Sequence, residues 1–380
     1  MVGCKVNGGL THFEFYRVSI VGKITLKEIA DILGVSIGTV DRAIHNRPEI
    51  SSRTREAVLK AVELYGYKPD KVARSLSLKS KRKKIGVISK EKPDFFWNMI
   101  NAGIKTAQKE LTDYGIEVIF RTYREEGQIE TITRNMEEFI ENNVDAIAVV
   151  PKNIACIRDK INEAVGNGIV VSTFNDDLNN SKRAFYVGPQ ARQSGRIAGE
   201  LMGRFLKNSG RVLILNIDIG SWEYFERLEG FKEILREKFS GINILADINF
   251  EYNENGINET NIKYILENLG DIDGIYDVDG ASLYNVAHIK DSIGQLKNSI
   301  LIGHEIWSRV SDYIADGTIS ACISQDPFTQ GYYIMKLLFN CLTEGSMPRF
   351  EKMYTRLDVI MKENLVNKDN IINPFFSELY

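Results

Sequence analysis

The chain has 380 residues, of which 43% are hydrophobic and 26% charged, with a formal net charge of −3 at pH 7. This length exceeds one ordinary domain, and the composition excludes a disordered or fibrous chain. No apolar run is long enough to cross a bilayer, and residues 1–23 have no signal-peptide pattern. The four cysteines are widely scattered, which indicates reduced thiols. We therefore expect a cytoplasmic protein of two or three domains.

The charge is unevenly distributed along the chain. Residues 24–84 hold 14 Lys or Arg and 7 Asp or Glu, a balance of +7, whereas residues 85–380 carry −12. A basic module beside an acidic body suggests an anionic partner for the module, although a solvated basic surface would have the same count.

Residues 24–69 have the pattern of three short helices. In "TLKEIADILG" the apolar residues have helical spacing, and Gly34 supplies the left-handed turn that ends the first helix. Ser36 then caps a second helix that runs from Ile37 to about Asn46. Pro48 interrupts the helical pattern before the third helix, "RTREAVLKAVELYGY", which Ser51 or the next serine caps.

The second helix has few large apolar side chains, with Val40 and Ile44 on its one apolar face. Two helices joined by a tight glycine turn, followed by a third, form a helix-turn-helix. The polar face of its second helix is then expected to enter the major groove of DNA.

The stretch from Ile24 to Leu76 resembles the DNA-binding headpiece of the lactose-repressor (LacI/GalR) family of transcription regulators. The resemblance rests on T-L, G-V-S, T-V-x-R, I-S, T-R and G-Y-x-P-x-x-V-A-x-S-L. It implies that Thr39 and Arg42 contact phosphates and the floor of the major groove. Ile37 and Gly38 would then occupy the positions that read bases. The DNA-contacting residues implied by the resemblance are Thr25, Ser36, Ile37, Gly38, Thr39, Asp41, Arg42, His45, Ser51, Arg55, Ala73 and Leu76.

Two of these residues depart from the family pattern, Asp41 (usually serine) and His45 (usually asparagine). The Asp41 carboxylate is able to accept from a cytosine amino group, or to pair with Arg42 or cap the helix. Residues 70–83 resemble the family's hinge helix, and the resemblance implies that Leu76 inserts between base steps of the minor groove and bends the DNA. The alternative is that Leu76 is an ordinary linker residue.

After Lys84, apolar strand-like runs alternate with amphipathic helical stretches. This alternation predicts parallel sheets covered on both faces, and the length of the region predicts two lobes. The region resembles the type I periplasmic sugar-binding fold, which serves as the effector domain of LacI/GalR regulators. We thus predict a small all-α headpiece and a two-lobed α/β domain. The predicted limits are 1–23 (N-terminal extension), 24–69 (headpiece), 70–83 (hinge) and 84–375 (effector domain; lobes 84–189 with 326–353, and 190–325 with 354–375).

In this fold the ligand lies in the cleft at the carboxyl ends of the strands. Aromatic residues would cover the apolar face of a sugar, and polar residues would bond its hydroxyls. The predicted effector-binding residues are Asp94, Phe96, Trp97, Asn175, Asp176, Arg227, Asp279, Glu305 and Gln325. Acids at strand ends also act as helix caps. Trp222 and Trp307 are expected to be core residues, with a place in the lining of the cleft as the alternative. The many carboxylates suit a neutral polyhydroxylated ligand, a monosaccharide or polyol, and argue against a highly anionic one.

No catalytic motif is present in the sequence: G-x-S-x-G, H-E-x-x-H and the phosphate-binding glycine loops are all missing. We therefore predict no enzyme activity, no cofactor and no metal. The predicted function is that of a ligand-responsive transcription regulator, and we expect a repressor. We expect it to bind a pseudo-palindromic operator as a homodimer and not to contact a membrane. Two alternatives are a solute-binding protein of a sugar transporter and an enzyme on a DNA-binding scaffold.

Overall fold

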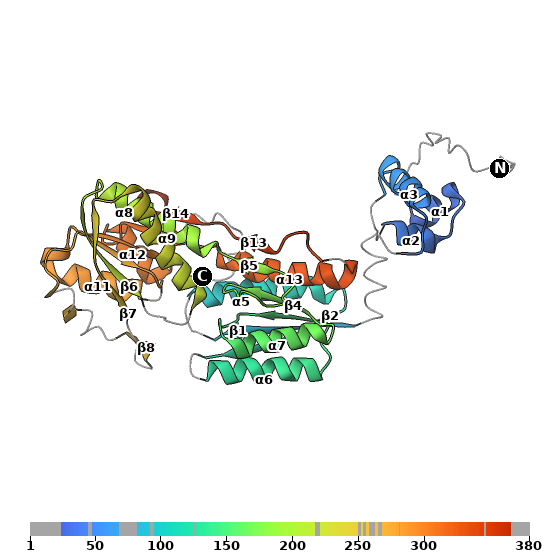
Figure 1. Cartoon of the computed structure of the whole chain (residues 1–380), viewed down its shortest axis with the longest axis horizontal. Coiled ribbons are helices and arrows are strands. Elements are labelled where there is room, and N and C mark those ends of the chain that lie inside the picture. The colour runs from blue at the N-terminus through green and yellow to red at the C-terminus, as the bar shows by residue number, and fades with distance from the viewer. Residues whose placement is uncertain are drawn as a thin grey trace. The chain divides into compact units, whose positions relative to one another are not determined.

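The computed structural model describes residues 24–44, 48–67, 82–91, 95–124, 127–216, 221–249, 252–253, 256–257, 263–264, 268–280, 282–345 and 347–365 (Figure 1). The chain divides into two compact units, Met1–Ser77 and Leu78–Tyr380. Of the predicted hinge, residues 70–81 lie outside the described part of the chain, and the first strand of the second unit begins at Lys83.

The first unit contains three helices, α1 (Leu26–Leu33), α2 (Ile37–Ile44) and α3 (Ser52–Leu64). Thr25 and Glu28 form a capping box at the start of α1, and Gly34 ends it with a φ of 64°. These helices agree with the sequence prediction. The second helix, predicted to reach about Asn46, ends at Ile44, and residues 45–47 lie outside the described residues.

The core of this unit is a small apolar cluster to which all three helices contribute. Ile29 of α1, Val40 of α2 and Val58 of α3 are fully buried in it. The predicted inward residue Ile44 is half-buried, and Ala43 takes a buried place beside Val40. Because α2 buries so few side chains, most of its surface remains exposed.

The second unit contains two six-stranded sheets. The first has the order β13-β5-β4-β3-β1-β2, and its neighbouring strands are all parallel. Helices α5 and α13 cover one face and α6 and α7 the other (Figure 1). Its strands and helices are β1 (Lys83–Lys90), α5 (Phe95–Thr112), β2 (Ile116–Tyr123), α6 (Gln128–Glu141), β3 (Ala146–Val149), α7 (Ala155–Gly166), β4 (Val170–Phe174), β5 (Tyr186–Gly188), α13 (Pro327–Glu344) and β13 (Lys352–Tyr354).

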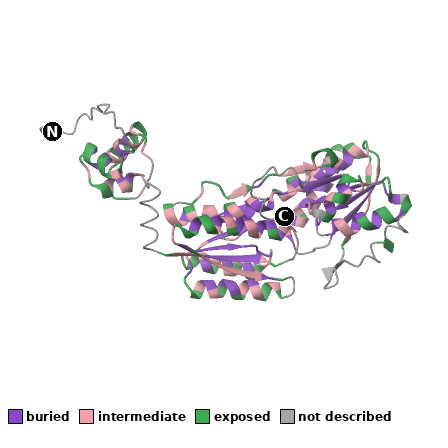
Figure 2. Ribbon diagram, turned by 180° about the vertical axis from the view of Figure 1, so that it is seen from behind, coloured by how far each residue is buried: buried purple, intermediate pink, exposed green. Residues whose placement is uncertain are grey.

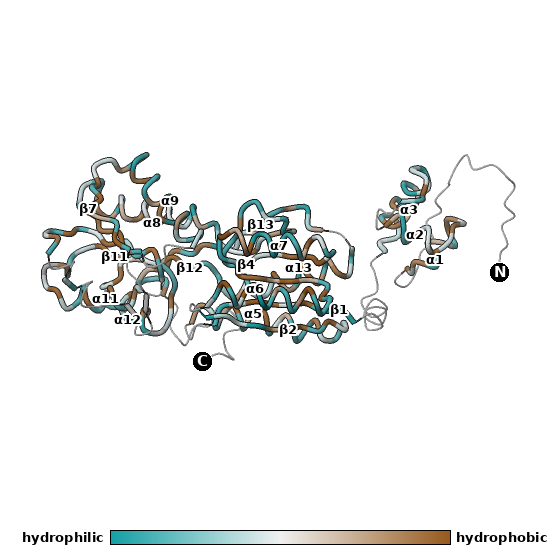
Figure 3. Tube along the Cα trace, turned by 60° about the horizontal axis from the view of Figure 1, so that its bottom comes forward, coloured by the Kyte–Doolittle hydropathy of each residue, from teal (hydrophilic) through white to brown (hydrophobic). Residues whose placement is uncertain are grey.

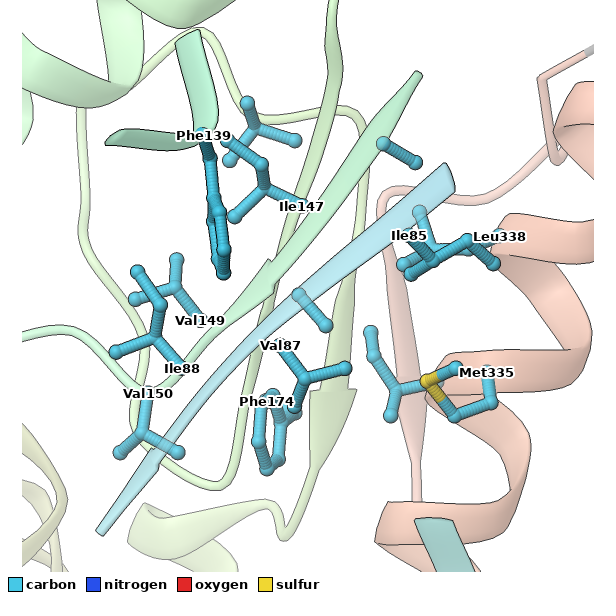
Figure 4. Packing of buried hydrophobic residues seen from close by; sticks show 14 of the residues in the cluster. Ile85, Val87, Ile88, Phe139, Ile147, Val149, Val150, Phe174, Met335 and Leu338 are labelled. Atoms are coloured by element: carbon cyan, nitrogen blue, oxygen red, sulfur yellow. The ribbon is translucent and has the colours of Figure 1, made fainter. Parts of the chain in front are cut away.

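The core of the first sheet has apolar side chains on both faces of its central strands. Figure 4 shows Met335 and Leu338 of α13 on one side of β1, and Phe139 of α6 on the other. The β1 residues Ile85 and Val87 are fully buried between these helices. Burial on both faces explains the near-continuous apolar runs in the sequence (Figure 3).

The second sheet has the order β14-β12-β11-β10-β6-β7, in which β14 is antiparallel to β12 and the other neighbours are parallel. Alternate residues along β6 enter different clusters: Leu213 packs with α11 and α12, and Val212 packs with α8 and α9. Figure 2 shows that the strands are largely buried, whereas the helices have exposed surfaces. Its elements are α8 (Ala191–Phe205), β6 (Gly210–Asn216), α9 (Trp222–Lys238), β7 (Ile242–Asn249), β10 (Gly274–Asp277), α11 (Leu283–Ser292), β11 (Ile300–His304), α12 (Ser308–Ala315), β12 (Ala321–Ser324) and β14 (Asp358–Ile360).

The chain passes between the two sheets after β5, after β12 and after β13. Thr355, in the third of these passages, is hydrogen-bonded to the other two. Its N–H donates to Gly188 O at 2.9 Å. Its Oγ1 donates to Gln325 O, also at 2.9 Å. The three passages therefore form one bonded unit.

The predicted fold class, a helical headpiece with a two-lobed α/β domain, is confirmed. The ten strand-like runs in the sequence correspond to β1–β7 and β10–β12. The short strands β8 (Tyr252–Asn253), β9 (Gly256–Ile257), β13 and β14 were not predicted, nor were the 3-10 turns Gly294–Leu296 and Lys362–Asn364.

Helices α8 and α9 approach so closely that their contact surface requires glycine. A Cβ on Gly195 would lie 1.8 Å from Arg227 O, and one on Gly230 would lie 2.1 Å from Arg192 O. No side chain fits at these distances, so both residues let α9 carry Arg227 against α8.

We expect Gly195→Ala to destabilise the second unit by about 1–3 kcal/mol or more, because the added methyl group must push the two helices apart. The matched control is Gly166→Ala in α7, where a Cβ would have no atom within 4 Å. Urea unfolding of both variants checks this expectation. Equal stability of the two variants would show that α8 and α9 have room to move.

Candidate functional site

Three helix N-termini of the first unit are capped by residues predicted to contact DNA. The Thr39 N–H donates to Ser36 Oγ at 3.0 Å. Ser51 accepts from the Thr54 N–H at 3.1 Å, and Thr25 caps α1. The capping role predicted for Ser36 is confirmed. Helix N-termini also favour nearby anions because unpaired N–H groups point outward there.

The exposed face of α2 carries the predicted base-reading residues. Ile37 is 48% exposed although it is large and apolar. Gly38 and Arg42 are exposed on the same helix, and a Cβ on Gly38 would lie 3.9 Å from Arg42 Nη1. Asp41 is half-buried, as is Arg55 on α3. This face is thus a polar surface with one apolar side chain.

Four predicted site residues lie outside the described residues: His45, Ala73, Leu76 and Asp94. Their roles stay predictions.

In the second unit the predicted ligand residues lie at the carboxyl ends of strands from both sheets. Asn175 and Asp176 follow β4 of the first sheet, while Asp279, Glu305 and Gln325 follow β10, β11 and β12 of the second. All five are buried, with exposed fractions of 3–8%. The carboxyl ends of parallel strands lie along one edge of a sheet, which is where ligands bind in folds of this kind.

Arg227 is the most deeply buried cation of this group, with 1% of its surface exposed. Its Nη1 donates to Val278 O at 3.0 Å, and its Nη2 donates to Glu223 Oε1. Part of its hydrogen-bonding capacity is therefore used within the protein, because Glu223 stands one helical turn before Arg227 and pairs with it.

Asp176 connects the two sheets. The Ser221 hydroxyl, at the N-terminus of α9, donates to Asp176 Oδ2 at 3.2 Å. The Asp177 N–H donates to the other oxygen at 2.9 Å. Burial raises the pKa of Asp176 to about 7; the charge of Glu223 adds to this rise and that of Lys152 opposes it.

A second connection runs through Gln330 in the first turn of α13. Asn175 Nδ2 donates to Gln330 Oε1 at 3.3 Å. Gln330 Nε2 donates to Gln325 O at 3.1 Å, in the second passage between the sheets. The side chain of Gln325 is hydrogen-bonded to Glu223. A continuous chain of bonds therefore joins the end of β4 to the Arg227–Glu223 pair.

Two of the acids at the strand ends have specific local roles. Tyr224 OH donates to Asp279 Oδ1 at 2.9 Å. Glu305 has a φ of 63°, a region that non-glycine residues rarely occupy. This conformation is held by the Glu305 N–H, which donates to Ile323 O at 3.1 Å, and by Cys322 Sγ, 2.9 Å from Glu305 O. Strained residues of this kind cluster at ligand sites.

Some buried polar atoms near these residues have no hydrogen-bond partner within the described part of the chain. They include Asn216 Oδ1 at the end of β6, Arg227 Nε and Gln325 Oε1. Leaving such an atom unpaired costs about 1–3 kcal/mol, so natural structures keep few of them without a purpose. Two acceptors and one donor thus remain for a ligand.

Sequence reasoning missed Asn216, Ser221, Glu223, Tyr224 and Gln330. Asn216 ended a strand run that was recognised, and Glu223 stood at i, i+4 spacing from Arg227, so both had a usable signal. Gln330 lies inside a helix, and no sequence pattern marked it as a site residue.

The two aromatic residues predicted to contact the ligand, Phe96 and Trp97, differ in burial. Trp97 is 6% exposed and belongs to the core of the first sheet. Phe96 is half-buried, and its ring lies 5.5 Å from that of Trp97 in an edge-to-face arrangement. Phe96 is thus the more accessible of the two rings, and a ligand contact of either ring stays a prediction.

Ser194 and His304 in the second unit form a serine–histidine pair of the kind found in some enzymes. Ser194 Oγ lies 3.3 Å from His304 Nδ1, and Tyr276 OH lies 3.0 Å from Nε2. All three side chains are completely buried. Burial, together with the charge of Arg227, lowers the pKa of His304 well below its usual value. The neutral imidazole therefore joins α8 to the second sheet.

Among the described residues, no group of three or more His, Cys, Asp or Glu is arranged to hold a metal ion. Over the same residues, no helix combines the length and apolar character needed to cross a membrane.

Comparison with known proteins assigns both units. Residues 85–346 match the family described as "Periplasmic binding protein domain". Residues 25–70 match "Bacterial regulatory proteins, lacI family". The chain thus carries a domain of the lacI family of bacterial regulatory proteins at residues 25–70, and its larger part belongs to the periplasmic binding protein domain family.

Individual relatives include regulators and binding proteins. The HTH-type transcriptional regulator MalR of Clostridium butyricum is 26% identical over 67% of this chain and 73% of its own. The ribose operon repressor of Halalkalibacterium halodurans is 26% identical over 70% and 75%. A solved ABC transporter solute-binding protein from Burkholderia graminis, in complex with D-arabinose, covers 74% of this chain and 96% of its own. It has 23% identity and a TM-score of 0.68, which shows a common fold.

We expect Asp176→Asn to stabilise the second unit increasingly as the pH rises. The native carboxyl has a raised pKa of about 7, so the folded state holds a proton that the unfolded state releases near pH 4. Stability is therefore lost as the pH rises through this window, and asparagine, which keeps an acceptor oxygen, removes the loss. The gap between variant and parent should widen by roughly 2 kcal/mol from pH 5 to pH 8.

Urea unfolding at both pH values measures this gap. The control is Asp312→Asn on the exposed surface of α12, where no such widening is expected. A constant gap for Asp176→Asn would mean that this carboxyl is ionised in the native protein.

Proposed function

We propose that this lacI-family regulator is a repressor whose affinity for its DNA operator is controlled by a small sugar or polyol bound between the strand ends of the two sheets. The observation that carries the proposal is a buried polar cluster, with atoms left over for a ligand, in the same chain as a helix-turn-helix unit. The protein would act in the cytoplasm.

The DNA side of the proposal rests on α2. Its exposed residues Ile37, Gly38 and Arg42 would face the major groove, where Ile37 would contact a thymine methyl group. The capped helix N-termini would hold phosphates. Because a single short helix reads few base pairs, we propose that a homodimer reads a pseudo-palindromic operator. The hinge, with Ala73 and Leu76 in the minor groove, remains part of this proposal.

We expect Arg42→Ala to weaken operator binding by about tenfold or more and to lower the salt dependence by about one counterion. The operator would first be obtained by selection from a random duplex library. The matched control is Lys60→Ala, which removes the same charge from the exposed surface of α3. If both variants bound the selected DNA equally well, α2 would not be the reading helix.

The ligand side rests on the strand ends. The carboxylates and amides there would accept hydrogen bonds from hydroxyl groups, and Arg227 Nε would donate to one. Binding would draw the two sheets together, because Asp176 and Ser221 come from different sheets. The bonded passages around Thr355 and Gln325 would carry that movement through the domain. A bistable domain of this kind supplies the control that a regulator needs.

We expect a thermal-shift panel of sugars and polyols to contain a compound that raises the melting temperature and changes operator affinity, since a ligand of the native state stabilises it. Asn216→Ala should lower affinity for that compound by about tenfold or more, because the Asn216 Oδ1 has no hydrogen-bond partner among the described residues and would be free to bond the ligand. Calorimetry measures this affinity. If the affinity of the variant were unchanged, Asn216 would not belong to the ligand site.

A solute-binding protein is the second candidate function, favoured by the fold shared with transporter components. It differs in one measurable respect, since such a protein would bind the sugar and no operator. An enzyme would consume the sugar in a mixing assay. We propose neither, because a solute-binding protein would not use the helix-turn-helix unit and the sequence has none of the catalytic motifs searched.

A further inference from the structure

Arg227 places a permanent positive charge among the buried polar residues at the strand ends. It is 1% exposed, and arginine does not lose its proton in proteins. Its Nη1 donates to Val278 O at 3.0 Å, and this neutral acceptor does not compensate the charge. Burying such a cation is costly unless a carboxylate pairs with it. We use the name strand-end cluster for Asn175, Asp176, Arg227, Asp279, Glu305 and Gln325.

Glu223 supplies a carboxylate for this cation. It is 6% exposed, lies one helical turn before Arg227 on α9, and its Oε1 accepts from Arg227 Nη2. The Gln325 side chain also donates to the Glu223 carboxylate, and Arg227 feels the charge of Glu305 as well. Burial raises the pKa of Glu223, while the Arg227 charge and the Gln325 bond act against that rise. Both neighbours act as donors, which suits the ionised carboxylate because that form only accepts. The charge of Arg227 is therefore balanced inside the protein.

The Glu223 carboxylate also fixes which way the Gln325 amide points. An amide side chain ends in an NH2 group, which donates, and an oxygen, which accepts. Because the carboxylate only accepts, the NH2 group of Gln325 turns toward Glu223 and its Oε1 turns away. Gln325 is 3% exposed, and its Oε1 has no partner among the described residues. Glu223 therefore leaves the acceptor end of this amide for a ligand.

Arg227 Nε is a second atom left for a ligand, since this N–H has no hydrogen-bond partner within the described part of the chain. On an unpaired arginine it would bond a carboxylate group more strongly than a hydroxyl group. Here a ligand carboxylate at Nε would share the guanidinium with Glu223, and the two like charges would repel each other. It would also offer no donor to Gln325 Oε1. Hydroxyl groups accept and donate, so they satisfy both Nε and Oε1.

We propose that Glu223 is a specificity-determining residue, which makes this site select neutral sugars or polyols and reject the corresponding sugar acids. This inference rests on the proposed function and assigns the selectivity within its site. Glu223 acts through two neighbours, because it balances the charge of Arg227 and presents the oxygen of Gln325. It need not touch the ligand itself.

The test uses calorimetry on the full chain with pairs of probes that differ by one group: D-glucose and D-glucuronate, D-galactose and D-galacturonate, D-mannose and D-mannuronate. These are measured with the wider panel of neutral sugars and polyols. In the pair that binds best, we expect the neutral member to bind about tenfold or more better than its acid. An acid that binds as tightly as its neutral counterpart, or more tightly, overturns the inference and leaves the proposed function standing. A panel in which nothing binds contradicts both.

A variant separates the charge of Glu223 from its shape. Glu223→Gln keeps the size and one acceptor oxygen but leaves the Arg227 charge unbalanced, so the preference for the neutral member should fall about tenfold. The matched control is Glu237→Gln, which removes an exposed carboxylate of the same helix that also pairs with an arginine, Arg196. It should leave the preference unchanged. A preference that survives Glu223→Gln overturns the proposal.

A second variant, Arg227→Gln, changes the balance in the opposite direction. It leaves the Glu223 carboxylate without its cation, so the preference for the neutral member should rise about tenfold. Loss of either member of a buried ion pair lowers stability. Both variants are therefore also measured by thermal shift, since a bound ligand raises the melting temperature of a destabilised chain too. General loss of structure would not move the preference in opposite directions, and a preference that does not rise in Arg227→Gln contradicts the proposal.

Discussion

The Arg227–Glu223 ion pair is the interaction on which the strand-end cluster depends. A guanidinium that is 1% exposed is tolerated because Glu223 and Val278 O take its terminal nitrogens. Gly195 permits the close approach of α8 and α9 that carries Arg227 to this position. Gln325 bonds Glu223 from the second passage between the sheets, so the ion pair is tied to the segments that join them.

The lacI-family unit and the periplasmic binding protein domain contribute different physical properties to one chain. The first has a small apolar core and an exposed helix, α2, which suits binding to a surface outside the protein. The second has three large hydrophobic clusters and a buried polar cluster at the strand ends, which suits a small molecule. In the function we propose, a ligand changes DNA binding only if it binds one arrangement of the second unit better than another.

Much of this organisation follows from sequence pattern. Apolar runs alternating with amphipathic helices predicted the two parallel sheets, and Ser36 and Gly34 marked the ends of the first two helices correctly. The strands β13 and β14 escaped because each has three residues, too few to show a period. The candidate site was harder: strand ends located Asp176 and Gln325, but pattern cannot tell which polar atoms find partners. Three-dimensional packing decides that the terminal nitrogens of Arg227 are bonded, and that the side-chain oxygens of Asn216 and Gln325 find no partner among the residues that the structure describes.

The central claim is that one chain couples a ligand at the strand ends to DNA at the helix-turn-helix. Linkage makes this coupling reciprocal, so it is measured most directly from the ligand side. Calorimetry would compare ligand affinity for the free protein with that for the protein saturated with its selected operator. We expect the two affinities to differ by about 5–150-fold, and operator affinity to change by the same factor when ligand is present. Identical ligand affinities with and without operator would contradict the account.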